Sequence, residues 1–127
     1  MQKQASGSID MFLRLIPGVK AFKIATVTGF RILYLGQIVY FECIRKEWHV
    51  FLYDHNRFQL KSKTTAEDIL GYSEAFIQIN QHHVINIHFL SMIKGNECIL
   101  IPPFENKCPH KVSRIYKDIL LKKFCSI

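Results

Sequence analysis

The amino-acid sequence predicts a mainly β domain of the α+β class, in which short antiparallel strands are joined by tight turns and two helices are added. Three observations predict this class. Apolar and β-branched residues recur in short runs separated by polar or glycine-containing turns. The period changes to that of a helix at one internal and one C-terminal place. With 127 residues, 49% of them hydrophobic, the chain has material for one packed domain.

The first half of the chain is predicted to form strands with one helix at the end. Residues 22–27 and 30–35 flank a turn at Thr28 and Gly29, and residues 38–43 form another β-rich run. The polar loop 45–47 leads to strand 49–53, and the turn 54–56 leads to the hairpin arm 57–60. Residues 64–71 indicate a short capped helix, with threonine first, acids in the first turn and Gly71 last.

The second half continues with extended segments and closes with a helix. Residues 76–79 and 84–87 are predicted strands, and residues 97–101 are expected to pair with 107–108 in a last hairpin. An amphipathic helix begins at about Val112. Its predicted apolar face is formed by Val112, Ile115, Tyr116, Ile119, Leu120 and Phe124. We expect residues 1–19 to be an N-terminal tail or short extension and residues 20–127 to be the domain.

Positive charge is concentrated near the C-terminal end. The net charge is +7, and residues 107–127 contain six cations against one anion, Asp118. A compact domain with such a surplus suits a polyanion, either nucleic acid or an anionic membrane surface. The plainer alternative is a well-solvated surface helix.

Other classes of function have little support. The four cysteines are scattered without a CxxC pair, which suits free thiols in a reducing cytosol. No segment has the length of a membrane span, and the apolar run 11–16 is short and contains Arg14, so a cytoplasmic protein is expected. His82 and His83 would point to opposite faces of a strand, and Cys108 and His110 lack a metal-ligand spacing. We therefore expect no metal, no cofactor and no catalysis.

Three motifs in order resemble the LytTR family of DNA-binding domains. The run FIQINQHHVIN, residues 76–86, is similar to the family's aromatic residue, alternating strand and His-Arg-Ser-Tyr-hydrophobic-Val-Asn, and it keeps the final Asn86. The run IVYFE, residues 38–42, resembles the aromatic-aromatic-Glu strand. The run VSRIY, residues 112–116, is similar to the Val-Ser-Arg-x-Tyr that opens the last helix. The resemblance covers about residues 20–124, nearly the whole chain.

The resemblance implies small antiparallel sheets arranged lengthwise, with loops along one edge that enter successive major grooves of duplex DNA. Three segments here would face the DNA: the loop 45–49, the turn after Ile79, and the start of the last helix. The implied DNA-binding residues are Arg45, Lys46, Trp48, Asn80, Gln81, His82, Lys111, Ser113 and Arg114. The third segment also has a physical argument, because a helix N-terminus offers N–H groups to phosphate and arginine can bind guanine bidentately.

Two of these residues have plain alternatives. Arg114 could form a surface ion pair with Asp118 one turn later. Trp48 could stack on a sugar or a thymine methyl, but a single tryptophan is commonly part of a core. The family's His-Arg-Ser-Tyr is replaced by Asn80, Gln81, His82 and His83, so the second segment lacks its arginine. Gln and Asn can still pair with adenine.

The resemblance therefore predicts a sequence-specific transcriptional regulator. Family members often recognise paired direct repeats, which implies two copies on one site and a possible homodimer on DNA. Many carry a receiver domain before the DNA-binding output domain, and only about twenty residues precede the expected fold here, so a signalling partner protein is possible. The alternative is a LytTR-fold protein-interaction module whose DNA-reading loops are degenerate.

Overall fold

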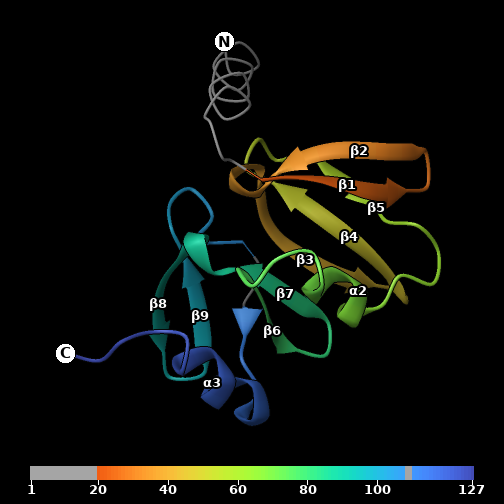
Figure 1. The fold of residues 1–127 in the computed structure, drawn as a ribbon. Helices are drawn as coiled ribbons and strands as arrows, with labels where there is room; N and C mark the ends of the chain where they lie inside the picture. The colour runs from red at the N-terminus through yellow and green to blue at the C-terminus, as the bar shows by residue number, and fades with distance from the viewer. Residues whose placement is uncertain (1–19, 108–109) are drawn as a thin grey trace.

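The computed structural model describes residues 20–107 and 110–127 and is built of three antiparallel sheets (Figure 1). The predicted tail 1–19 and Cys108 lie outside the described residues. A hairpin of β1 (Ala21–Thr26) and β2 (Gly29–Tyr34) forms the first sheet. The central sheet has five strands in the order β5 (Arg57–Gln59), β4 (Glu47–Leu52), β3 (Ile38–Ile44), β7 (His83–Asn86) and β6 (Phe76–Asn80). The third sheet has the order β10 (His110–Lys111), β9 (Glu97–Leu100) and β8 (Leu90–Lys94).

The remaining elements follow one another through short turns, as an antiparallel fold requires. A 3-10 turn, η1 (Leu35–Gln37), precedes β3, and a second, η2 (Ile87–Phe89), follows β7. The helices are α2 (Ala66–Leu70) and α3 (Arg114–Leu121).

The central sheet is covered on both faces, because successive side chains of a strand point to opposite sides. Phe41 belongs to a cluster with Trp48 and Phe76, under the β1-β2 hairpin and α2. Its neighbour Tyr40 belongs to a second cluster with Ile77 and residues of β9 and α3. In Figure 1 the first layer is at the upper right and the second at the lower left, with β3, β7 and β6 between them.

Asn86, the last residue of the motif FIQINQHHVIN, is fully buried and has a structural role. Its Nδ2 donates to the carbonyl of Ile38 over 2.8 Å and to that of Leu35 over 3.1 Å. Its Oδ1 accepts from the N–H of His88. A buried amide with these partners is satisfied, and it fixes η1 and η2 against β7.

The structure confirms the mainly β class and both helices, and it corrects two details. The predicted pairing of 97–101 with 107–108 is wrong: β9 pairs with β8 through the turn at Gly95 and Asn96, and with β10 on its other side. Strand β8 was missed because Ser91 and Lys94 are exposed and interrupt its apolar pattern.

The predicted apolar face of α3 is only partly buried. Leu120 is buried and Tyr116 is half-buried, whereas Ile115 is 76% and Ile119 51% exposed. Residues four apart stack along a helix, and Ile115 and Ile119 lie about 100° around the axis from the stripe of Tyr116 and Leu120. Phe124 lies beyond the end of α3 and is also exposed.

Candidate nucleic-acid interface

The three predicted segments lie at one end of the central sheet, joined by main-chain hydrogen bonds. The N–H of Cys43 donates to the carbonyl of His82 over 2.8 Å, which places the β3-β4 turn beside the β6-β7 turn. The N–H of Ser113 donates to the carbonyl of Ile79 over 2.8 Å, which places the start of α3 beside the same turn. We call this end the loop edge; it comprises residues 45–46, 80–82 and 111–114.

The β3-β4 turn is a two-residue turn made of Arg45 and Lys46. Ile44 pairs with Glu47, and the two turn residues have φ of 52° and 70°. This left-handed region is typical of type I′ hairpin turns, where Asn-Gly is the favoured pair, and it is costly for long side chains. Arg45 and Lys46 are thus exposed cations in a backbone conformation that is unfavourable for residues other than glycine, asparagine and aspartate. Backbone strain of this kind is common at functional sites.

Trp48 is not part of this turn, and its prediction as a DNA contact is wrong. The loop ends at Lys46, and Glu47, Trp48 and His49 are in β4. The Trp48 side chain is 6% exposed and packs in the same cluster as Phe41 and Val50. The alternation of β4 carries this indole inward, so the core explanation is the correct one.

Asn80 has a different environment from the one predicted for a base-reading side chain. Its Nδ2 donates to the carbonyl of Lys111 over 2.6 Å. Its Oδ1 accepts from the N–H of His82 over 2.8 Å and lies 3.0 Å from His83 Nδ1. The side chains of Gln81 and His82 are exposed at the tip of the turn. The structure thus brings all three residues to the loop edge but engages Asn80 within the protein.

The third segment enters α3 with its side chains exposed. Lys111 ends β10, Ser113 is the N-cap of α3 and Arg114 is its first residue; all three are exposed. The Ser113 side chain makes no capping hydrogen bond, so the hydroxyl is not used within the helix. Among the described residues no ion pair joins Arg114 to Asp118. Arg114 is therefore exposed at the N-terminus of α3 and is not engaged by Asp118.

His83 and Glu42 form a half-buried pair behind the turn. Their side chains approach to 3.5 Å between Nε2 and Oε2, and the two residues face each other across β7 and β3. Burial lowers the pKa of His83, and the Glu42 carboxylate acts in the opposite direction. Neither residue was singled out as a DNA contact in the sequence, and their pairing becomes evident only from the strand register.

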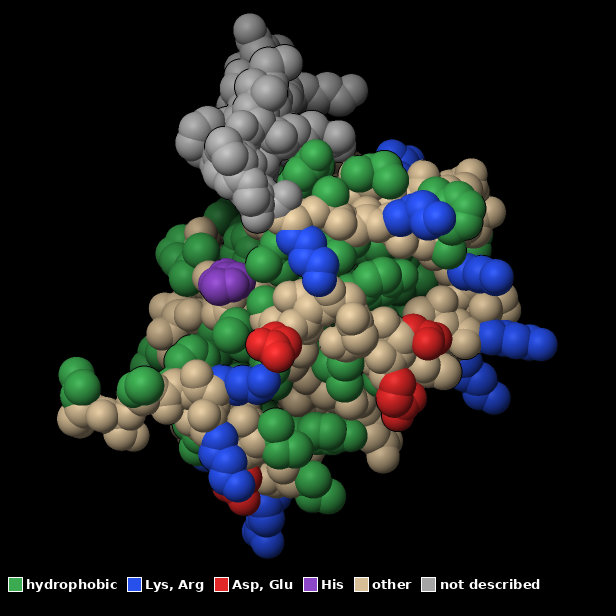
Figure 2. Space-filling model, in the orientation of Figure 1, with side chains coloured by type: hydrophobic (Ala, Val, Ile, Leu, Met, Phe, Trp, Pro, Cys, Tyr) green, Lys and Arg blue, Asp and Glu red, His purple; other side chains and the backbone are tan. Residues whose placement is uncertain are grey.

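The loop edge is hollowed between the β6-β7 turn and α3. Residues of the β6-β7 turn, of the turn before β9 and of the start of α3 line the depression: Asn80, Gln81, His82, His83, Asn96, Lys111, Val112, Ser113, Arg114, Ile115 and Tyr116. Figure 2 shows most of the visible Lys and Arg side chains projecting from the margins of the molecule, and acidic side chains nearer the middle of that face. The depression is lined by the cations Lys111 and Arg114 and by no acidic side chain, which favours an anionic partner.

Two further cations near this edge were missed. Lys61 and Lys63 follow β5 and are exposed, and the N–H of Leu60 donates to the carbonyl of Trp48, which keeps this loop beside the start of β4. Lys63 also has a positive φ, 70°. The signal was the triplet KSK, residues 61–63, whose nearness to Arg45 and Lys46 depends on the β4-β5 pairing.

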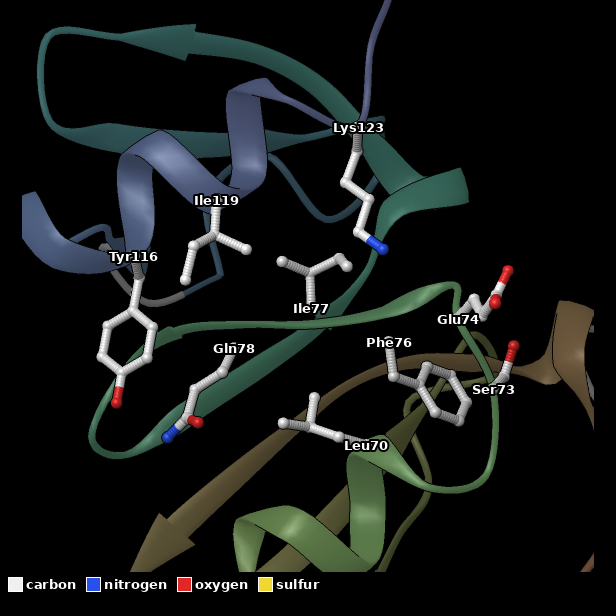
Figure 3. Close-up of a pocket in the computed structure, with 9 residues that line it drawn as sticks. All are labelled: Leu70, Ser73, Glu74, Phe76, Ile77, Gln78, Tyr116, Ile119 and Lys123. Carbon is white, nitrogen blue, oxygen red and sulfur yellow. The ribbon is translucent and has the colours of Figure 1, made fainter.

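A second concavity is separate from the loop edge. It follows the outer edge of β6 between α2 and α3, with Leu70 and Phe76 on one side of the strand and Ile77 and Ile119 on the other (Figure 3). Lys123 and Glu74 lie at one end of it, and Tyr116 and Gln78 at the other. Its two charged lining residues, Lys123 and Glu74, have opposite signs, so it lacks the net positive charge that the loop edge offers to a polyanion.

The described parts of the chain contain no cluster of metal ligands, and their cysteines are free. Over residues 20–107 and 110–127, no group of three His, Cys, Asp or Glu side chains could hold a metal ion. Cys43, Cys98 and Cys125 are free, and burial raises the pKa of Cys98 to about 11, which keeps that thiol protonated and unreactive. No described helix is long and apolar enough to cross a membrane.

Among solved structures, a similar fold occurs in the LytTr DNA-binding domain of a putative methyl-accepting/DNA response regulator from Bacillus cereus. The two chains are 16% identical with a TM-score of 0.58, over 83% of this chain and 96% of the other. No family model matches the sequence, and no curated protein matches it. The chain therefore has the fold of a LytTr DNA-binding domain, as the sequence motifs predicted.

Proposed function

We propose that this protein binds duplex DNA in a sequence-specific way through its loop edge and acts as a transcriptional regulator, not as an enzyme. The observation that carries the proposal is the convergence of the two turns and the start of α3 on one cationic edge. The fold it shares with a LytTr DNA-binding domain supports the same function.

Each segment has a distinct role in this proposal. Arg45 and Lys46 neutralise phosphates, as exposed cations at a turn are suited to do. Gln81 reads a base edge, since its amide can pair with adenine in the major groove. Arg114 reads guanine or grips a phosphate at the N-terminus of α3. Two copies on paired direct repeats would place successive edges along one face of the duplex, with or without contact between the copies.

The test is a selection from a random duplex pool followed by fluorescence anisotropy at several salt concentrations. We expect a defined consensus, and an affinity for it that falls steeply with salt because each neutralised phosphate releases condensed counterions. A scrambled duplex of the same length is the matched control. A flat salt response, or no binding at low salt, would overturn the proposal.

A second candidate is a protein-interaction module that keeps the fold after losing DNA readout. The observation that favours it is the composition of the β6-β7 turn, where Gln81 and His82 stand without an arginine. Binding of duplex with a normal salt slope but no enriched sequence would favour this candidate over specific regulation.

A further inference from the structure

We propose that Asn80 is a positioning residue which locks the β6-β7 turn to the approach of α3, and that His83 orients its amide. The effect on binding rests on the proposed function, because Asn80 would position a residue that contacts DNA. In this arrangement Asn80 does not contact a base. Instead it fixes where Arg114 stands relative to Gln81, so that the two side chains reach the duplex as one unit.

The first support is that both ends of the Asn80 amide are engaged by the protein. Its Nδ2 donates to the carbonyl of Lys111, 31 residues away, over 2.6 Å. Its Oδ1 accepts the N–H of His82 over 2.8 Å and meets His83 Nδ1 at 3.0 Å. An amide oxygen has two acceptor sites, and these two donors fill both. Bidentate pairing with adenine would require the amide to give up these partners.

The second support is the tautomer that this network imposes on His83. The oxygen of Asn80 is an acceptor only, so the Nδ1 that faces it must carry a proton. His83 Nε2 then faces the Glu42 carboxylate at 3.5 Å. In the neutral ring Nε2 carries no proton, so the hydrogen bond to Asn80 fixes the ring, and the pair with Glu42 of β3 adds to it only when His83 is protonated. A binding group keeps a precise position only when the residues behind it are themselves held by hydrogen bonds, as Asn80 is by His83.

The third support is the place where the bond to Lys111 acts. Two residues after Lys111, the N–H of Ser113 is bonded to the carbonyl of Ile79, the residue before Asn80. The side-chain bond and the main-chain bond therefore run in parallel between the same two segments. Together they fix both the distance and the rotation of the chain that leads into Arg114.

The experiment is a double-mutant cycle on the selected duplex with Asn80→Ala, Arg114→Ala and the double variant. If Asn80 acts through Arg114, Asn80→Ala alone should weaken binding by about 5- to 10-fold, and by less than about 2-fold when Arg114 is already alanine. Full multiplication of the two losses would overturn the inference, because it would show Asn80 acting on DNA by itself. Lys122→Ala, which removes an exposed side chain at the other end of α3, is the matched control for binding.

Hydrogen exchange of the free protein tests the bond between Asn80 and Lys111 without DNA. A failure of this inference can therefore be distinguished from a failure of the proposed DNA binding. We expect the N–H of Ser113 to exchange at least about 5-fold faster in Asn80→Ala, and unchanged in Gln81→Ala. Asn80→Asp keeps the oxygen that His82 and His83 use but removes the donor to Lys111, so it should behave like the alanine variant. His83→Phe, which keeps a ring but loses Nδ1–H, should show a smaller increase. Unchanged exchange in all three variants would overturn the inference.

Discussion

The N–H of Ser113 donates to the carbonyl of Ile79 over 2.8 Å, at the place where β6 departs from regular pairing with β7. The register shifts between Gln78 and Asn80, and such a bulge turns a strand and redirects its backbone groups. The carbonyl of Ile79 is thereby available to the chain entering α3. The position of Arg114 thus depends on a bulge in a strand more than thirty residues earlier.

Arg114→Ala should weaken binding to the selected duplex by roughly 1–3 kcal/mol and relax preference at one base, if Arg114 reads a base edge. If it grips only phosphate, all duplexes should weaken alike and the salt slope should fall by about one. Affinities for the selected and scrambled duplexes decide between these outcomes. Lys122→Ala removes a cation at the other end of α3 and is the control, and circular dichroism checks the fold of both variants.

Replacing Arg45 and Lys46 together by Asn and Gly should stabilise the protein and weaken DNA binding. The left-handed turn costs a bulky residue on the order of 1 kcal/mol, and Asn-Gly relieves that cost. The same change removes two exposed cations, so the salt slope should fall by up to about two. Urea unfolding and anisotropy measure the two effects. A loss of stability would show that these side chains stabilise the turn, and unchanged binding would remove them from the interface.

Phe76→Ala should cost about 3–5 kcal/mol of unfolding free energy, whereas Gln81→Ala should leave it nearly unchanged. Phe76 is 2% exposed and its ring lies 5.1 Å from that of Phe41. Gln81 is exposed at the turn tip, five residues away on the same segment. Thermal and urea unfolding of both variants give the comparison. A large loss for Gln81→Ala would mean that the tip supports the fold.

The sequence was sufficient to predict the elements whose pattern is local. Strand alternation and the capping residues of α2 are read within a few positions, and Thr65 accepts from Asp68 N–H as that pattern suggests. Trp48 was misplaced because the DNA-facing loop was predicted to extend over residues 45–49, whereas β4 already begins at Glu47. Within β4 the alternation of side chains carries Trp48 into the core.

The environment of Asn80 could not be predicted in the same way. Its partner Lys111 is 31 residues away, and no local pattern specifies a contact between a β-turn and the last residue of a strand that precedes a helix. The sequence identified the residue types that can contact DNA, but not which of them the protein itself engages. Glu42 and His83 were likewise brought together only by the pairing of β3 with β7.

Acidification should destabilise the fold in part through His83. Burial lowers its pKa below the usual value of about 6.5, with the Glu42 carboxylate opposing that effect and His82 adding to it. The unfolded chain therefore takes up a proton at a pH where folded His83 remains neutral. The stability that His83 contributes is complete above about pH 6.5 and is lost as pH falls through the lowered pKa of the folded state.

The measurement is the unfolding free energy in urea between about pH 7.5 and 5. His83→Phe should flatten the loss of stability over this range, because a ring that cannot be protonated has no proton to take up. Glu42→Gln should steepen the loss, since removing the carboxylate removes the group that raises the pKa of His83. Burial also lowers the pKa of His49, with Arg57 contributing, so His49→Phe should flatten a separate part of the loss and is the comparison for His83→Phe. If His49→Phe flattens the curve and His83→Phe leaves it unchanged, the acid sensitivity belongs to β4 and not to the pair behind the loop edge.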